Sequence, residues 1–368
     1  MSGRLVELLA GRAAPPPWAV APLCLLRAAG HAYGAAQGLR AAAYRRGWRT
    51  AYRAPCPVVS VGNLAAGGTG KTPMVVWLGE RLLAAGRRLA VVSRGYRQAS
   101  RAPVTVVADG RGHRLAPPEA ADEAALVAAR LPRAVVLTGV QRWRCIEVAV
   151  AEHGCDCILL DDGFQHLAVA RDLDLCLLDA ARPFANGACL PGGLLREWPG
   201  AVARADAAVL TRAGGGWEAA AGELRRRFPR LLLAACDHVV ESVTTADGRP
   251  VELSGKAVLA FCGIARPAAF RATLEGLGAR VVRLVAFGDH HRYTAGDLAD
   301  LEKQAREVGA AALACTEKDA VKLPQPAGLP LYVVRVGLRF LAGEAALLGR
   351  LAQAVGVEAA ALSPEGAP

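Results

Sequence analysis

A glycine-rich segment, residues 60–73, constrains the fold of this 368-residue chain more than any other feature. It follows a β-branched run at residues 58–61 and precedes a helical pattern that begins at Thr72. A strand, a glycine-rich turn and a helix in this order form a P-loop, whose backbone N–H groups and helix N-terminus surround a phosphate. The pattern G-x-x-x-x-G-K-[ST] is complete except that Ala65 stands in place of its first glycine.

This loop predicts a nucleotide site that holds ATP or a similar triphosphate with Mg²⁺. In a P-loop the lysine reaches the β- and γ-phosphates and the next hydroxyl holds Mg²⁺, roles that fall here on Lys71 and Thr72. The candidate nucleotide-binding residues are Ala65, Ala66, Gly67, Gly68, Thr69, Gly70, Lys71 and Thr72.

A pair of carboxylates supplies a candidate metal site. Asp161 and Asp162 follow four apolar residues, 157–160, that read as a buried strand. Acidic side chains at the end of a neighbouring strand complete the Mg²⁺ shell of a P-loop protein. An Asp-Asp-Gly sequence also forms turns. Beside a P-loop we favour a metal role for both aspartates, either direct or through water.

The rest of the chain alternates short apolar runs with amphipathic helical patterns. This alternation predicts an α/β fold, a P-loop NTPase-like and mostly parallel sheet covered by helices. Residues 237–255 are polar and turn-rich, with Ala-Asp-Gly at 246–248, and predict a β-hairpin-like linker to a second, smaller α/β domain. The expected division is an N-terminal segment 1–54, a P-loop domain 55–236, the linker 237–255, the smaller domain 256–358 and a tail 359–368. The predicted strands cover 58–61, 89–93, 104–108, 134–138, 157–160, 173–178, 207–211, 231–235, 257–261, 281–286, 311–314 and 331–334.

The positive charge gathers near the N-terminus. Residues 1–60 contain eight arginines and one glutamate, and so carry much of the chain's formal charge of +11. The uncharged stretch 13–26 is too short to span a bilayer and contains four prolines. Arginines interleaved with apolar and aromatic residues over 17–50 are typical of an amphipathic helix that lies on an anionic membrane surface. The pattern alone fits equally well a helix that packs on the rest of the protein. We expect no nucleic-acid partner, because the basic residues alternate with apolar ones and match no recognised nucleic-acid-binding fold.

Four motifs together resemble the tetraacyldisaccharide 4′-kinase family of lipid A biosynthesis. They are residues 60–73, Ser-Arg-Gly-Tyr at 93–96, Asp-Asp-Gly-Phe-Gln-His at 161–166 and Thr-Glu-Lys-Asp-Ala-Val-Lys at 316–322, in family order. The resemblance implies transfer of the γ-phosphate of ATP to the 4′-hydroxyl of a tetraacyldisaccharide 1-phosphate, which gives the 1,4′-bisphosphate lipid IVA. It also implies a peripheral protein on the cytoplasmic face of the inner membrane, docked through residues 17–50. No obligate protein partner is evident.

The resemblance also suggests roles for individual residues. The family's catalytic aspartate falls on Asp122, although Ala121 and Ala124 replace the usual flanking glycine and proline. Its Asp-His pair falls on Asp289 and His290, which would help Asp122 to deprotonate the sugar hydroxyl.

Further roles follow from the same comparison. Arg142 would contact a phosphate or stabilise the charge of the transition state. The segment 190–197 departs from the family at Gly192 and Leu194 and keeps Arg196 and Glu197. The roles of Lys318 and Asp319 remain open between nucleotide contact and helix capping.

One alternative class remains open, a P-loop GTPase or metallochaperone-type NTPase that works as a switch. Such a protein reads guanine through an Asn/Thr-Lys-x-Asp motif at the end of a strand. Thr-Glu-Lys-Asp at residues 316–319 resembles that motif superficially.

Overall fold

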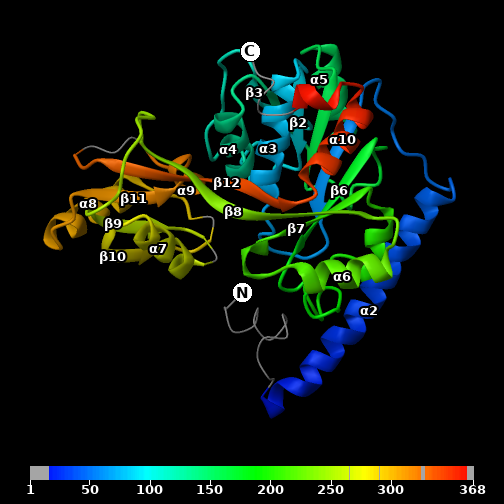
Figure 1. Ribbon diagram of the computed structural model, residues 1–368, viewed down its shortest axis with the longest axis horizontal. Coiled ribbons are helices and arrows are strands. Elements are labelled where there is room, and N and C mark those ends of the chain that lie inside the picture. Colours follow the sequence, from blue (N-terminus) through cyan, green and yellow to red (C-terminus); the bar gives the residue numbers. More distant parts are fainter. Residues whose placement is uncertain (1–15, 265, 290, 325–327, 363–368) are drawn as a thin grey trace.

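One sheet of twelve strands runs through the whole molecule, in the order β10-β9-β11-β12-β8-β7-β6-β1-β5-β2-β4-β3 (Figure 1). The computed structural model describes residues 16–264, 266–289, 291–324 and 328–362. Helices cover the sheet on both faces, and a large and a small lobe lie at its two ends (Figure 1). This arrangement agrees with the predicted mostly parallel α/β fold.

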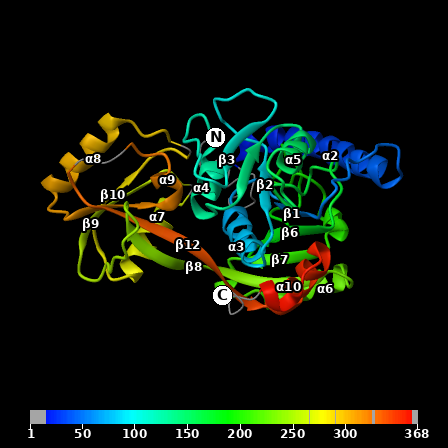
Figure 2. The same ribbon diagram turned by 90° about the horizontal axis from the view of Figure 1, so that it is seen from above.

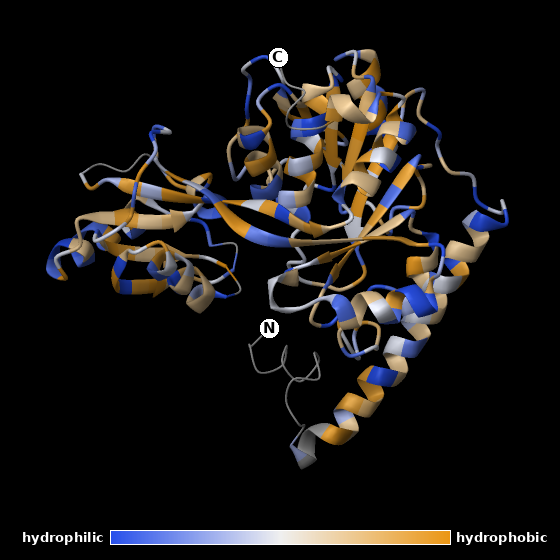
Figure 3. Ribbon diagram, in the orientation of Figure 1, coloured by the Kyte–Doolittle hydropathy of each residue, from blue (hydrophilic) through white to orange (hydrophobic). Residues whose placement is uncertain are grey.

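The large lobe contains the P-loop. Its central strand β1 pairs in parallel with β5 on one side and with β6 on the other. All six residues of β1 are buried, as expected for a parallel strand covered on both faces, and Figure 3 shows the strands of this lobe as mostly hydrophobic. The strands are β1 (Val58–Asn63), β2 (Leu89–Ser93), β3 (Thr105–Asp109), β4 (Val135–Thr138), β5 (Cys157–Asp161), β6 (Leu173–Asp179) and β7 (Ala207–Thr211). The helices are α3 (Lys71–Ala84), α4 (Asp122–Arg130), α5 (Arg142–Ala151), α6 (Glu218–Arg227) and the 3₁₀ turns η1 (Pro199–Arg204) and η2 (Ala213–Gly215).

The small lobe continues the same sheet with parallel strands and its own helices. Leu259 and Phe261 of its central strand are buried with Leu298 and Leu301 in a separate apolar core. Its elements are β9 (Ala257–Cys262), α7 (Pro267–Gly276), β10 (Arg280–Ala286), α8 (Ala295–Glu307), β11 (Ala312–Thr316) and α9 (Glu317–Ala320).

Two long strands, β8 (Leu232–Thr245) and β12 (Leu331–Ala342), connect the lobes as an antiparallel pair (Figure 2). The predicted turn at 246–248 forms, with Gly248 at φ 87° and a backbone hydrogen bond of 2.8 Å from Thr245 to Arg249. The linker nevertheless differs from a local hairpin. Strand β8 pairs over most of its length with β12, which begins more than eighty residues further along the chain. Sequence periodicity does not identify this pairing.

The last helix, α10 (Glu344–Val355), returns to the large lobe. Leu347 and Leu351 are fully buried in the same apolar cluster as Val59 of β1 and Met74 of α3. The expected division placed these residues in the smaller domain. The chain therefore leaves the large lobe through β8 and comes back to it through β12, and a short 3₁₀ turn, η3 (Ala359–Leu362), follows.

Helix α2 (Pro17–Arg45) lies along the edge of the large lobe (Figure 1). A Cβ at Gly30 would clash with the Cys189 carbonyl, and one at Gly34 would clash with Trp198, so these glycines allow the helix to approach closely. Within the described part of the chain, no helix is long and apolar enough to cross a membrane. On the opposite side, α2 exposes uncharged apolar residues, among them Ala21, Leu25, Ala28, Ala32, Ala36 and Leu39.

Candidate functional site

The turn between β1 and α3 has the backbone of a phosphate-binding loop. Gly67 and Gly70 have φ angles of 121° and 82°, a region that favours glycine. A side chain at Gly70 would also clash with the ring of His238. Helix α3 begins at Lys71, so the helix N-terminus adds its positive end to the loop, as the sequence predicts.

Asn63, the last residue of β1, holds this loop in shape. Its Nδ2 donates to the Ala65 carbonyl at 2.8 Å and to Thr69 Oγ1 at 2.7 Å, and the residue is fully buried. Its own carbonyl accepts a hydrogen bond of 2.9 Å from Gln165 Nε2. Sequence reasoning assigned Asn63 no role. The available signal was a polar residue at the end of an otherwise apolar strand.

The side of the loop nearest β7 is fixed by two residues at the end of that strand. Thr211 Oγ1 donates to the Thr69 carbonyl at 3.0 Å. The Arg212 guanidinium donates to the Gly68 carbonyl and pairs with Asp179 at 2.9 Å. These contacts engage two carbonyls of the loop, while the Ala66 amide donates to the Leu194 carbonyl at 2.7 Å. No local sequence pattern indicated them.

Asp162 lies beside the P-loop lysine, as the metal-site prediction requires. Its Oδ1 is 3.6 Å from Lys71 Nζ, and Arg196 Nη1 donates to both of its carboxylate oxygens at 2.8 Å. Burial raises the pKa of this carboxyl, but the charges of Lys71 and Arg196 outweigh burial and hold the pKa below its usual value. Asp162 is therefore ionised and already paired.

The pKa of Asp161 shifts in the opposite direction from that of Asp162. This residue ends β5, directly across from Val61 of β1, and is only 3% exposed. Its Oδ1 has no hydrogen-bond partner among the described residues. Burial, with the negative charges of Glu123 and Asp162, raises its pKa to about 7.

These observations test whether Mg²⁺ fits the site. An unpartnered buried carboxylate oxygen is costly, and a divalent cation would satisfy it. Mg²⁺ prefers oxygen ligands and binds proteins through one or two carboxylates plus substrate phosphates. Asp161, Asp162 and the Thr72 hydroxyl at the start of α3 supply that donor set, so the residues present fit the ion.

Arg142, the first residue of α5, points at the acidic pair. It is 4% exposed, and its Nη1 donates to the Asp162 carbonyl at 2.9 Å. Burial lowers the pKa of this guanidinium, and the charges of Asp162 and Asp161 act against that effect. The predicted Arg142 is thus positioned within the site, where its charge can act on a phosphate.

Arg196 and Glu197, the two residues of the 190–197 segment that match the family pattern, both form ion pairs. Arg196 holds Asp162, as described above. Glu197 is 4% exposed and accepts two hydrogen bonds of 2.7 Å from Arg204. Arg204 also donates to the Phe164 carbonyl at 2.9 Å, so this pair supports the 161–166 motif from behind.

Asp122 is the first residue of α4, and its neighbour Glu123 acts electrostatically on Asp161. The negative charge in the first turn of α4 therefore contributes to the raised pKa of Asp161 at the end of β5. Ala121 precedes the helix in an extended conformation, so the departure from the family pattern still permits a regular helix start. The catalytic role of Asp122 stays a prediction.

Asp289 lies in the loop after β10 of the small lobe. Its side chain is 52% exposed, and its Oδ1 is 3.5 Å from Lys318 Nζ. The predicted partner His290 lies outside the described residues. The same loop touches the large lobe, because Arg292 Nη2 donates to the Arg97 carbonyl at 3.4 Å, next to the 93–96 motif.

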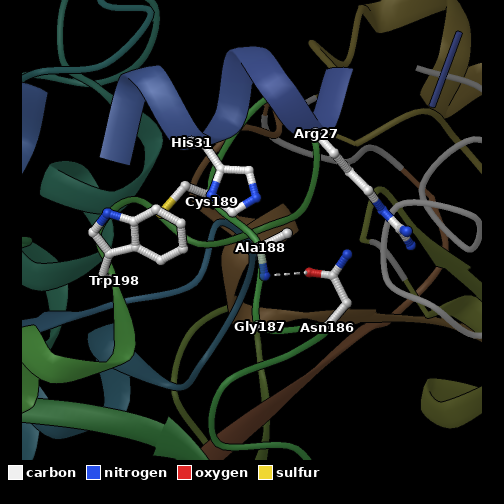
Figure 4. A pocket seen from close by; sticks show the side chains of 7 residues that line it. All are labelled: Arg27, His31, Asn186, Gly187, Ala188, Cys189 and Trp198. Atoms are coloured by element: carbon white, nitrogen blue, oxygen red, sulfur yellow. Dashed lines mark hydrogen bonds between the residues drawn. The ribbon is translucent and has the colours of Figure 1, made fainter. Parts of the chain in front are cut away.

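A cavity of about 200 Å³ lies between α2 and the loop at 186–198. Figure 4 shows His31 pointing from α2 toward Cys189, with Trp198 beside it; the His31 and Trp198 ring centroids are 5.1 Å apart. Arg27, one helical turn earlier, also lines this cavity. Further along α2, Arg40 donates to the Gln165 carbonyl at 3.1 Å, which connects the helix to the 161–166 motif.

A P-loop whose lysine meets paired carboxylates on the neighbouring parallel strand defines the class of P-loop nucleotide-binding proteins. Within that class, the model of the family described as tetraacyldisaccharide-1-P 4′-kinase matches residues 22–356, and the chain belongs to this family.

Individual relatives agree with this assignment. The tetraacyldisaccharide 4′-kinase of Anaeromyxobacter dehalogenans strain 2CP-C is 44% identical over 366 residues, covering 96% of this chain and 95% of the relative. That of Syntrophotalea carbinolica is 43% identical over 335 residues, covering 90% and 91%. A solved structure described as the "apo" form of LpxK from Aquifex aeolicus in complex with ATP aligns with a TM-score of 0.72 and 26% identity, over 89% of this chain and 97% of that one. The family resemblance of the four sequence motifs is thereby confirmed.

Proposed function

We propose that this chain transfers the γ-phosphate of ATP to the 4′-hydroxyl of a tetraacyldisaccharide 1-phosphate, giving the 1,4′-bisphosphate lipid IVA. The single observation that carries the chemistry is the buried Asp161 Oδ1, which has no hydrogen-bond partner in the described part of the chain. Asp161 lies beside Asp162, which pairs with Lys71 of the P-loop. Family membership supplies the acceptor.

The nucleotide half of the site follows from the P-loop. Backbone amides of residues 67–72 bind the β- and γ-phosphates, and Lys71 neutralises their charge. Thr72, Asp161 and Asp162 would hold a magnesium ion, which when bound would supply positive charge next to the transferring phosphate. Arg196 keeps Asp162 ionised and oriented.

The acceptor half uses carboxylates from both lobes. Asp122 takes the proton of the 4′-hydroxyl, and the Asp289–His290 pair of the small lobe assists it. The 4′-oxygen forms a bond to the γ-phosphorus while the bond from that phosphorus to the β–γ bridging oxygen breaks, and ADP leaves. Arg142 stabilises the charge on the transferring group.

The acyl chains of the substrate stay in the membrane in this proposal. Helix α2 presents the uncharged face described above, with Leu25 and Leu39 each 74% exposed. Such a face can enter the boundary between headgroups and acyl chains. Arg27 and His31 flank it and can meet anionic headgroups in the adjacent cavity. We therefore place the protein peripherally on the cytoplasmic face of the inner membrane.

The alternative of a GTP-reading switch lacks its reading group. The motif at residues 316–319 is in the small lobe, and the Asp319 side chain is completely buried. Its Oδ1 accepts hydrogen bonds from Tyr293 and from the Gly263 amide. A carboxylate engaged in this way is not available to a nucleotide base.

The deciding experiment incubates the protein with ATP, Mg²⁺ and a tetraacyldisaccharide 1-phosphate in mixed micelles, and reads the lipid product by mass spectrometry. We expect one added phosphate, formed with ATP in preference to GTP, and no product from Lys71→Ala. Turnover of nucleotide without lipid phosphorylation would contradict the proposal.

A further inference from the structure

Helix α9 connects elements of both lobes. It follows β11 directly, and its first three residues, Glu317, Lys318 and Asp319, each have a different partner. The contact between α4 and α9 is one of the places where the lobes meet away from the β8–β12 pair. These partners assign the part of the 316–322 motif that the sequence leaves open.

Asp319 fixes α9 to the loop that contains Asp289. Its Oδ1 accepts hydrogen bonds from Tyr293 at 3.0 Å and from Lys322 Nζ at 3.0 Å, and its Oδ2 accepts one of 2.7 Å from Thr316. Tyr293 lies at the end of the loop after β10 and packs edge-on against Phe287 at its start, with centroids 5.1 Å apart.

This cluster is almost dry, since the side chains of Lys322 and Asp319 are 2% and 0% exposed. A hydrogen-bonded cluster that is closed to water keeps a single geometry. Tyr293 and Phe287 are therefore held in one arrangement relative to helix α9.

Glu317 ties the same helix to the large lobe. Its Oε2 accepts a hydrogen bond of 2.9 Å from Arg130 Nη1, and the Arg130 side chain is only 9% exposed. Arg130 also bonds Glu241 of β8 at 2.5 Å and lies 3.5 Å from Glu80 of α3. Burial lowers the pKa of Arg130, but Glu317 and Glu241 outweigh burial and raise it. Arg130 is thus a charged anchor at the end of α4.

Lys318, unlike Glu317, contacts the small lobe: its Nζ is 3.5 Å from Asp289 Oδ1. The Lys318 side chain is 26% exposed, whereas that of Asp289 is 52% exposed. Because α4 begins with Asp122 and ends with Arg130, a chain of contacts joins Asp122, α4, Arg130, Glu317, Lys318 and Asp289 in that order.

We propose that Lys318 and Glu317 are positioning residues: Lys318 orients the Asp289 carboxylate, and the Glu317–Arg130 pair holds that carboxylate at a fixed place relative to the helix that begins with Asp122. This inference rests on the proposed function, in which the two acidic groups act on one hydroxyl. Neither Lys318 nor Glu317 touches substrate in this role.

The test compares Lys318→Met, Arg130→Met and the double variant with the wild type in the lipid kinase assay. If the Asp289 carboxylate is misplaced, the chemical step slows but nucleotide binding is unchanged. Each single variant should therefore lower kcat about tenfold and leave the KM for ATP as it is. Because both residues act through Asp289, the double variant should lose about as much as the stronger single variant, whereas independent effects would multiply. Lys318→Arg should restore most of the activity. Lys303→Met, an exposed lysine of α8 in the same lobe, is the matched control and should behave as wild type.

A readout independent of turnover is hydrogen exchange of the 287–293 loop, which should accelerate in Lys318→Met and not in Lys303→Met. Wild-type kcat in Lys318→Met, or multiplicative losses in the double variant, would overturn the inference while leaving the kinase assignment standing. Absence of lipid phosphorylation by the wild type would instead contradict the proposed function.

Discussion

Asp161 and Asp162 are consecutive in the chain, yet their carboxylates meet opposite surroundings. Asp162 is paired with both Lys71 and Arg196, whereas Oδ1 of the more deeply buried Asp161 has no partner among the described side chains and backbone groups. Asp161 ends β5, whereas Asp162 follows it with a left-handed backbone at φ 52°. The two aspartates should therefore respond differently to substitution.

Asp161→Asn should abolish the response of the protein to Mg²⁺. In the wild type, Mg²⁺ added with ATP should raise the melting temperature above that with ATP and a chelator, because ligand binding stabilises the native state by about 2.7 kcal/mol at a hundred times its Kd. The asparagine variant should lack this difference and show no lipid phosphorylation. Asp162→Asn is the comparison and should keep part of the Mg²⁺ response, because Asp161 remains in place. Equal Mg²⁺ responses in the two variants would contradict the distinction.

Asn63→Ala should weaken ATP binding without unfolding the protein. The substitution removes the hydrogen bonds to Ala65 and Thr69 that shape the phosphate loop. Two hydrogen bonds contribute about 1–3 kcal/mol, so the Kd for ATP measured by calorimetry should rise roughly fivefold or more. Asn186→Ala, which alters an amide near α2, should leave that Kd unchanged.

His166→Gln should make the protein less sensitive to acid. Burial, followed by the charges of Arg142 and Arg171, lowers the pKa of His166 to about 4. The unfolded chain therefore binds more protons than the native protein between about pH 6.5 and pH 4, and stability is lost as the pH falls through this window. Urea unfolding at pH 7 and pH 5 should show a smaller loss for the variant than for the wild type. The exposed His113→Gln should keep the wild-type dependence.

Leu25→Asp and Leu39→Asp should each weaken binding to anionic vesicles. Both side chains lie on the exposed apolar face of α2. Transfer of a leucine side chain into an apolar environment contributes about 1.5–3 kcal/mol, so flotation should show a loss of about tenfold or more for each variant. Val140→Asp, at a residue that is 69% exposed elsewhere on the large lobe, should bind like the wild type. Equal binding of all four proteins would argue against docking through α2.

Leu351→Ala should destabilise the large lobe, although Leu351 is near the C-terminus. The residue is fully buried against the cluster that contains Val59 and Met74. A leucine-to-alanine change in a core costs about 2–5 kcal/mol, measurable by denaturant unfolding. Leu341→Ala, at a 41% exposed position of β12, should cost far less.

The parts of the fold that local sequence determines were predictable. The strands at residues 89–93 and 207–211 match β2 and β7 in both bounds. The P-loop, the helix after it and the acidic end of β5 also form where the pattern indicated, because each depends on neighbours along the chain.

Long-range pairing set the limit of the prediction. The strands expected at 231–235 and 331–334 extend to Thr245 and Ala342, because the two pair with each other over ten positions. Polar residues such as Asp237 and Glu241 in this half-buried pair obscure a continuous strand pattern. In the site, Asn63, Arg212 and the partner of Lys318 were missed for a similar reason: a polar side chain acquires its role from residues distant in sequence.

The course of the chain through β8 and β12 makes the small lobe an insertion within the large one. Where the chain crosses between the lobes, Ser242 and Arg335 are paired as neighbours. A two-residue turn joining the strands at that point would close an ordinary β-hairpin and leave α10 with its apolar partners. The core of the nucleotide-binding half is thus built from chain segments on both sides of the small lobe, and the loop with Asp289 belongs to the inserted part.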